Sequence, residues 1–271
     1  MLRTVLSSLA LCLFSFTTPG ADNGLYQMPA PETEENVAGF TSGVSLTFAE
    51  KQLFFEKHLE DVYDEADLKK TGLSFDVFRK AVIGFHNFKQ KQLVSPSKSI
   101  ITVVDFTKSS RDKRMWIIDL KSKKLLFNNL VAHGRNTGED KALNFSNKAN
   151  SNMSSIGFYL TGKTYFGKHG LSLKLDGMDE KYNSNARDRA IVVHGADYAT
   201  EKFVKQYGRL GRSLGCPAVP REISKEVIEH IKDNTVMYIH SADKNYNSSY
   251  LNPATAVEVF ALEAVAQGQT V

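Results

Sequence analysis

Apolar side chains change their spacing along the chain, from a helical period near the start to short continuous runs after residue 100. They recur every three or four positions over about 46–68 and again over about 74–90, which predicts two helices. Ser74 is a suitable N-cap for the second helix, and Pro96 ends the helical pair. The second helix carries a row of apolar side chains that we expect to pack in the core rather than bind a ligand: Phe75, Phe78, Val82 and Phe85.

Short apolar runs separated by Gly, Asn, Asp and Ser then predict a series of strands. These runs are 100–106, 115–120, 125–133, 157–160, 171–175, the run that ends at His194, and 236–240. One helix is expected after Pro220, where helical spacing returns, and a last one from Asn252 and Pro253 to near Gly268. Many strands with few helices predict a mainly-β domain over 97–243, between a helical segment, 46–96, and a tail with a helix, 244–271.

The first residues have the features of an export signal. Arg3 is followed by an apolar stretch and then by small residues near Ala21, so residues 1–21 are expected to be a cleaved signal peptide. The alternative is an uncleaved anchor, but the apolar stretch is shorter than the roughly 20 residues that span a bilayer. Residues 22–45 are rich in Pro, Gly, Thr and Glu and predict a flexible leader. We therefore expect a periplasmic or cell-envelope protein with no membrane span after cleavage.

The charge balance is mild. The chain has 34 Lys and Arg against 30 Asp and Glu, a formal net charge of +4. Loss of the signal removes Arg3 and no acid, which leaves +3, because 4 − 1 = 3. The basic clusters 108–114 and 121–124 fall between apolar runs, where solvated hairpin ends are expected. No nucleic-acid partner is predicted.

Cysteine usage singles out one side chain. The chain has two cysteines, and Cys12 falls in the expected signal, so Cys216 would remain without a disulfide partner in an exported protein. A thiol acts as a nucleophile only as the thiolate, which needs a base nearby. His194 ends a strand and Cys216 follows Gly215 in a turn, so two loops could bring Nε2 and Sγ within hydrogen-bond distance. Residue types alone leave a buried, structural Cys216 and a core His194 equally open.

Longer strings carry a family resemblance. Residues 191–195 end in His194 and Gly195, and 213–216 read Ser-Leu-Gly-Cys; together they resemble the signature of the YkuD-type L,D-transpeptidases. Residues 154–159 resemble an upstream strand of that family. The segments 132–138 and 215–218 closely resemble its murein L,D-transpeptidase catalytic-domain subgroup, with a Ser-x-Gly-Cys-Pro-Ala motif. The resemblance covers about residues 98–242.

The resemblance implies a β-sandwich catalytic domain and a cysteine acyltransferase that acts on peptidoglycan stem peptides. Cys216 would attack the bond before a terminal D-alanine and form a thioester, which an amine would resolve into a 3→3 cross-link. His194 would be the base and then the acid, oriented by Gly195, and Ser213 would brace the loop or contact substrate. Backbone amides of Leu214, Gly215 and Cys216 would hold the oxyanion. Alternatives are an L,D-carboxypeptidase, in which water resolves the thioester, and a non-catalytic peptidoglycan-binding module.

Some positions depart from the family pattern. Eighteen residues, 195–212, separate His194 from Ser213, slightly more than is usual, and Pro217 and Ala218 replace the commoner residues after the cysteine. Arg212 is a candidate to bind a stem-peptide carboxylate, or else an exposed loop arginine.

Three further side chains bear on the expected groove. His169 is expected to line it and Tyr198 to form a lid or wall. His133, His169 and His194 could be combined with Cys216 as a zinc set, but they lack close paired spacing, so no metal or other cofactor is expected. The sequence does not identify the acceptor amine, the protein partners or the role of residues 46–92.

Overall fold

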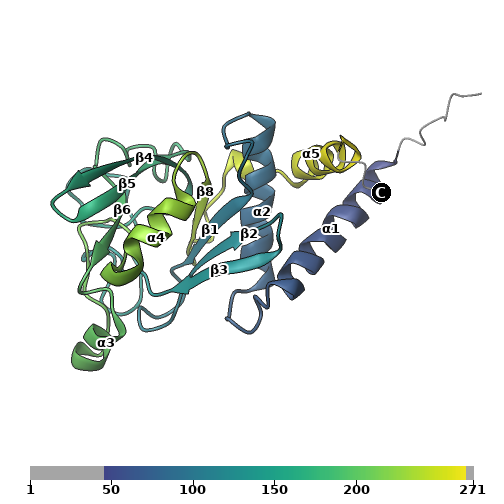
Figure 1. The fold of residues 1–271 in the computed structure, drawn as a ribbon. Helices are drawn as coiled ribbons and strands as arrows, with labels where there is room; N and C mark the ends of the chain where they lie inside the picture. Colours follow the sequence, from purple (N-terminus) through teal and green to yellow (C-terminus); the bar gives the residue numbers. More distant parts are fainter. Residues whose placement is uncertain (1–45, 267–271) are drawn as a thin grey trace, which may run out of the picture. The chain divides into compact units, whose positions relative to one another are not determined.

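The computed structural model describes residues 46–266 (Figure 1). The expected signal peptide and leader, 1–45, lie outside the described residues. The helices are α1 (Phe48–Glu65), α2 (Phe75–Gln90), α3 (Glu201–Tyr207), α4 (Arg221–Ile231), the short 3-10 helix η1 (Ser249–Leu251) and α5 (Pro253–Ala266). The strands are β1 (Ile100–Asp105), β2 (Met115–Asp119), β3 (Lys124–Asn129), β4 (Gly157–Gly167), β5 (Gly170–Gly177), β6 (Val192–Ala196), β7 (Ala218–Pro220) and β8 (Val236–His240).

All eight strands are hydrogen-bonded into one mixed sheet, in the order β3-β2-β1-β8-β4-β5-β6-β7. The pairs β1·β8 and β6·β7 are parallel and the other neighbours are antiparallel. One apolar cluster contains side chains from β1, β2, β4, β5, β6, β7 and β8, so the sheet curves around it. The predicted mainly-β fold with an N-terminal helical segment and a C-terminal helix is confirmed.

Helices α1, α2 and α5 share an apolar core with one face of the sheet. Helix α1 begins with a capping box, which gives hydrogen-bond partners to two backbone N–H groups of its first turn. The Glu50 N–H donates to Thr47 Oγ1 at 3.3 Å, and the Thr47 N–H donates to the Glu50 carboxylate at 2.8 Å. Ser74 caps α2 as predicted, because its Oγ accepts from the Val77 N–H. Gly84 lies directly against the Phe158 ring, so the absence of a side chain there allows α2 to approach β4. Because this core is continuous, the helical segment and the sheet form one packed body.

The opposite face of the sheet is covered by α4. Its apolar stripe, Val227, Ile228 and Ile231, is fully buried, as the spacing after Pro220 predicts. Alternate residues of β1 divide between the two cores: Val103 faces the α1–α2–α5 side and Val104 faces the α4 side.

Two elements next to the site have no clear sequence signal. Helix α3 has no buried residue, so no apolar period marks it, although Thr200 caps it. Strand β7 is three residues long and directly follows the cysteine turn.

Strand β4 is longer than predicted, since its second half is largely exposed and pairs only with β5. No helix within 46–266 is long and apolar enough to cross a membrane.

Candidate active site

The parallel pair β6·β7 places the two predicted catalytic residues on neighbouring segments. His194 lies on β6 opposite Ala218 of β7, and Cys216 lies two residues before Ala218. This register places Cys216 alongside Val192 rather than alongside His194. Figure 1 shows β6 and α3 at the end of the sheet remote from α1 and α5.

The turn that carries Cys216 is held by Ser213. Its Oγ donates to the Cys216 carbonyl at 2.6 Å and accepts the Gly215 N–H at 3.0 Å. Gly215 has φ +129°, and a Cβ there would lie 2.8 Å from the Met153 carbonyl oxygen, so only glycine fits.

The same turn leaves two backbone donors unused. Within residues 46–266, the N–H groups of Leu214 and Cys216 meet no acceptor, whereas that of Gly215 is engaged by Ser213. The Leu214 side chain is exposed, and the Cys216 side chain is half-buried. Two free N–H groups at the thiol are the arrangement that stabilises an oxyanion.

Residues 132–134 and 154 support this turn from beneath. Ala132 bridges to Ala218, and Gly134 bridges to Ser213. Ser154 Oγ accepts the Gly134 N–H at 3.0 Å and donates to the Gly215 carbonyl at 3.1 Å. The cysteine turn is therefore fixed to the sheet by hydrogen bonds on both sides.

His133 is a structural histidine beside this support. Arg114 is completely buried and its Nη2 donates to His133 Nδ1 at 2.8 Å, so Nε2 carries the proton and donates to the Gly138 carbonyl at 3.2 Å. Burial and the Arg114 charge lower the pKa of His133 to about 4. Among residues 46–266, no three His, Cys, Asp or Glu side chains are grouped so as to hold a metal ion.

His194 is buried and neutral. Its Nδ1 lies 3.1 Å from the Gly195 carbonyl oxygen, which can only accept, so Nδ1 carries the proton and Nε2 keeps a free lone pair. Burial lowers the pKa of His194, and the neighbouring His169 and Arg221 lower it further. The exposed His169, from the β4–β5 turn, stacks on the His194 ring at 4.2 Å between centroids. His194 of β6 therefore presents a neutral Nε2 with a free lone pair, which is what a general base requires.

The Cys216 thiol does not make the expected hydrogen bond to His194. Sγ instead donates to the Ala190 carbonyl oxygen at 3.7 Å, and no bond to the imidazole is present in the described part of the chain. The register of β6 and β7 explains the difference, because it aligns Cys216 with the segment just before His194. Burial raises the pKa of the thiol, while the Val192 N–H and the Arg189 charge oppose that rise.

Arg189 is the site residue that the sequence analysis missed. Its guanidinium donates to the carbonyls of Ser146 and Met153 at 2.7 and 2.6 Å, and to the hydroxyls of Ser151 and Ser155. It also lies at the Gly215 turn, since Nη2 would be 3.3 Å from a Cβ on Gly215. Its only sequence signal was a position just before the strand that ends at His194.

The other predicted contact residues occupy different positions. The Tyr198 side chain packs against Gly211, and burial together with the Cys216 charge raises the pKa of its hydroxyl to about 12. Arg212 donates to the carbonyls of Arg135 and Gly138 and pairs with Glu139 at 2.6 Å. Tyr198 therefore lies near the thiol, whereas the Arg212 guanidinium is occupied by the 135–139 loop.

A single half-buried cysteine on a glycine turn, a neutral histidine on the adjacent strand and two free amides define the class: a candidate cysteine acyl-transfer site at the edge of a curved sheet. Residues 69–240 match the family described as the L,D-transpeptidase catalytic domain. The chain belongs to this family, as the resemblance predicted. A comparison with curated proteins gave no match.

Solved L,D-transpeptidases show similarity at low identity. An L,D-transpeptidase from Mycobacterium smegmatis is 8% identical with a TM-score of 0.34, over 53% of this chain and 59% of that chain. L,D-transpeptidase 3 from Mycobacterium tuberculosis, solved with a faropenem-derived adduct, is 12% identical with a TM-score of 0.33, over 53% and 61%. The helical cell shape determining protein Pgp2 (K307A mutant) from Campylobacter jejuni is 13% identical with a TM-score of 0.39, over 69% and 65%. The match thus spans less than two thirds of each of these structures.

Proposed function

We propose that this protein is an exported peptidoglycan L,D-transpeptidase whose nucleophile is Cys216. The observation that carries the proposal is the position of Cys216: a half-buried thiol on a braced turn, next to the strand that holds a neutral His194, within the matched family region. The family acts on the cell wall, which supports export to the periplasm or cell envelope. The expected signal at 1–21 remains a prediction.

In the proposed acylation, Sγ leaves the Ala190 carbonyl by rotation about the Cα–Cβ bond and gives its proton to His194 Nε2. The sulfur then attacks the carbonyl carbon that precedes the terminal D-alanine of a stem tetrapeptide. The developing oxyanion is held by the Leu214 and Cys216 N–H groups. His194 returns the proton to the departing amine as the C–N bond breaks, so D-alanine leaves and a thioester remains.

In the proposed second step, an amine of another stem peptide attacks the thioester and loses a proton to His194, and the thiol is released. Water in place of the amine gives an L,D-carboxypeptidase. Gly195 fixes the imidazole through its carbonyl, and Ser213 fixes the turn. We further propose that His169 and Tyr198 form walls of the substrate groove and that Arg212 contacts a stem-peptide carboxylate, for which it must exchange its partner Glu139.

The test combines acylation by a carbapenem with analysis of purified muropeptides. Wild-type protein is expected to gain the mass of the drug and to form cross-linked dimers, while Cys216→Ala does neither and keeps its fold. His194→Gln is expected to slow acylation by about 100- to 10,000-fold, and His230→Gln, on the exposed side of α4, to leave the rate unchanged. Unchanged labelling of Cys216→Ala would remove Cys216 from the mechanism. Shortened monomers alone would identify a carboxypeptidase, and binding to sacculi without turnover a non-catalytic module.

A further inference from the structure

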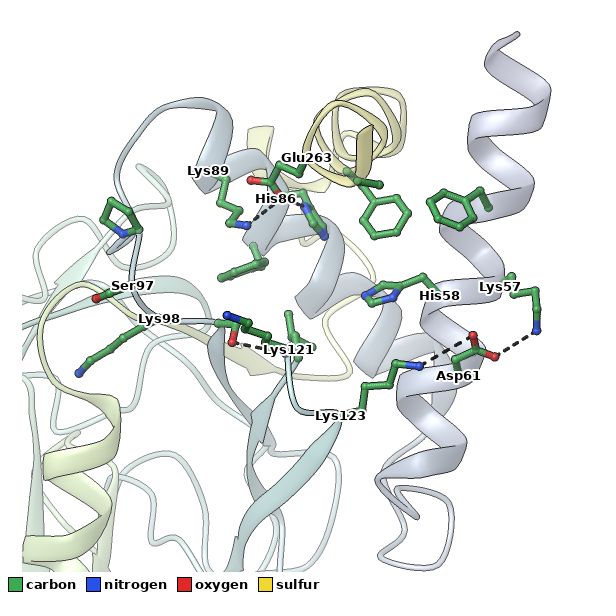
Figure 2. A pocket seen from close by; sticks show the side chains of 17 residues that line it. Lys57, His58, Asp61, His86, Lys89, Ser97, Lys98, Lys121, Lys123 and Glu263 are labelled. Atoms are coloured by element: carbon green, nitrogen blue, oxygen red, sulfur yellow. Dashed lines mark hydrogen bonds and ion pairs between the residues drawn. The ribbon is translucent and has the colours of Figure 1, made fainter. Parts of the chain in front are cut away.

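A cavity lies between the helical segment and the sheet, on the face opposite α4. Its volume is about 510 Å³, within the usual range for small-molecule sites. It is lined by residues of α1, α2, α5, the loop 96–99 before β1, and residues 120–123 around the β2–β3 turn (Figure 2). None of the residues that line it belongs to the Cys216 site. The cavity thus gives the segment 46–92, which has no evident role in the proposed chemistry, a candidate binding function.

The cavity contains a buried polar atom with no partner. His86, on α2, is 4% exposed, and its Nδ1 has no hydrogen-bond partner. The imidazole makes edge-on contacts with three phenylalanine rings, and the distances between ring centroids are 5.4 to 5.6 Å. These rings belong to Phe55, Phe85 and Phe260. The nearest carboxylate oxygen, on Glu263, is 3.8 Å from Nδ1 and is already bonded to Lys89 at 2.7 Å. An unsatisfied buried nitrogen is costly, and a ligand in the cavity could satisfy it.

The charge of the lining is positive. Five lysines line the cavity against two carboxylates, Asp61 and Glu263. Asp61 contacts Lys57 and Lys123, and Glu263 contacts Lys89. Within residues 46–266, the ammonium groups of Lys98 and Lys121 have no carboxylate oxygen within 4.0 Å, although Lys98 Nζ donates to the Lys232 carbonyl at 2.7 Å and points toward α4. The lining therefore has unneutralised positive charge, which favours an anion.

The remaining wall is apolar. It is formed by aromatic rings on three helices together with smaller groups: Phe54, Phe85, Phe260, Pro96, Leu120 and Ala264. His58 of α1 lies over the Phe260 ring at 4.7 Å between centroids. Burial and the nearby Lys123 lower the pKa of His58, and burial lowers that of His86 to about 3, so both imidazoles are neutral at pH 7. Neutral rings add hydrogen-bonding and stacking groups without adding charge.

We propose that this cavity binds a small organic anion in which a carboxylate is attached to an apolar or aromatic group. The carboxylate would lie toward Lys121 and accept a hydrogen bond from the His86 ring, and the apolar group would pack on Phe54 and Phe260. Both a free aryl acid and the C-terminal carboxylate of a peptide have this chemistry. The site does not depend on Cys216.

The experiment follows the His86 ring signals of the isotopically labelled full-length chain by NMR during titration. The probes are 3-phenylpropionate for the free acid, N-acetylphenylalanine for a peptide terminus, and N-acetylphenylalanine amide as the neutral control. We expect saturable shifts at His86 with the acids and weaker or no binding of the amide. The tighter of the two acids identifies the source of the carboxylate. Absence of saturable shifts at His86 with either acid, or equal binding of the amide, overturns the proposal.

Three variants make the test more specific. Lys121→Glu and Lys124→Glu make the same change in charge on neighbouring exposed residues, but only Lys121 lines the cavity. Lys121→Glu is expected to weaken binding about tenfold, and Lys124→Glu far less; equal losses would indicate nonspecific attraction and refute the site. His86→Phe should also weaken binding about tenfold, and if it does not fold, the lysine pair still decides. Because no turnover is measured, the outcome is independent of the proposed enzyme activity.

Discussion

Replacement of Arg189 tests whether the guanidinium beside the cysteine turn controls the ionisation of Cys216. In Arg189→Gln the positive charge is lost, so the thiolate loses a favourable interaction and the pKa of the thiol rises further. At an effective dielectric of about 20, two unit charges about 4 Å apart interact by about 4 kcal/mol, and the energy falls as their separation grows. Solvent screening at a half-buried thiol reduces the expected interaction to about 1.4 kcal/mol, which corresponds to a factor of about 10 in the thiolate fraction.

The assay is the pH dependence of alkylation of Cys216 by iodoacetamide, followed by intact mass. Below the thiol pKa the rate is proportional to the thiolate fraction, so the loss of this interaction slows alkylation about tenfold at neutral pH. Arg187→Gln is the matched control, because Arg187 lies two residues away and pairs with Asp176 on the surface. Arg189→Lys keeps the charge but loses the forked contacts to Ser146 and Met153, and an intermediate profile is expected.

One result would refute this reasoning. If Arg189→Gln and Arg187→Gln give the same alkylation profile as the wild type, the guanidinium acts only as a brace for residues 146–155. Loss of that brace removes the guanidinium donor to the partly buried Met153 carbonyl, while the Ser146 carbonyl still accepts from the Ser155 hydroxyl, and lowers stability by about 1 kcal/mol. Thermal unfolding of the same variants therefore separates the structural effect from the electrostatic one.

Two further predictions concern stability. Gly215→Ala is expected to lower the free energy of unfolding by about 2 kcal/mol more than Gly208→Ala does, as measured in denaturant titrations. Both glycines have positive φ, but only at Gly215 would a Cβ meet backbone, at 2.8 Å from the Met153 oxygen. Equal losses of stability in the two variants would show that the close contact relaxes freely. Acid should destabilise the fold through His86 and His133, whose pKa values fall to about 3 and about 4 in the folded protein. The unfolded chain binds these protons near pH 6.5, so the stability is complete above that pH and declines as the pH falls toward the folded values. Between pH 7 and 5 each histidine accounts for about 2 kcal/mol, so urea titrations of His86→Phe should show a shallower decline than wild type, and parallel curves would contradict the assignment.

The strand and helix pattern was largely predictable because burial imposes a period on the sequence. The apolar runs that predicted β1, β2 and β8 are buried over nearly their whole length. The buried stripe of α4 is visible in the sequence as apolar residues at helical spacing. Helix α3 was not predicted, because a helix with no buried residue leaves no such period. Of the site residues named by motif, His194 lies on β6 and Cys216 lies in the turn just before the neighbouring strand β7.

The motif did not predict the local arrangement of Cys216 and His194. The thiol contact to Ala190 follows from the register of β6 and β7, which depends on pairing over a separation of more than twenty residues. Arg189 was missed for a related reason: its contacts lie 34 to 43 residues away, in segment 146–155, so no spacing near Arg189 reveals them.

The pKa shifts of Cys216 and His194 also determine the protonation state of the site in the free protein. Burial raises the pKa of Cys216 and lowers that of His194, so both changes oppose a thiolate–imidazolium pair. The free protein at neutral pH then holds a thiol bonded to Ala190 and a neutral imidazole with Nε2 available. In the proposed chemistry, proton transfer would therefore accompany or follow substrate binding, when the carbonyl occupies the turn and the Leu214 and Cys216 amides would stabilise negative charge. On this basis the Val192 N–H and Arg189 have a specific part in the proposed chemistry: they limit the cost of forming the thiolate in a site whose burial otherwise opposes it.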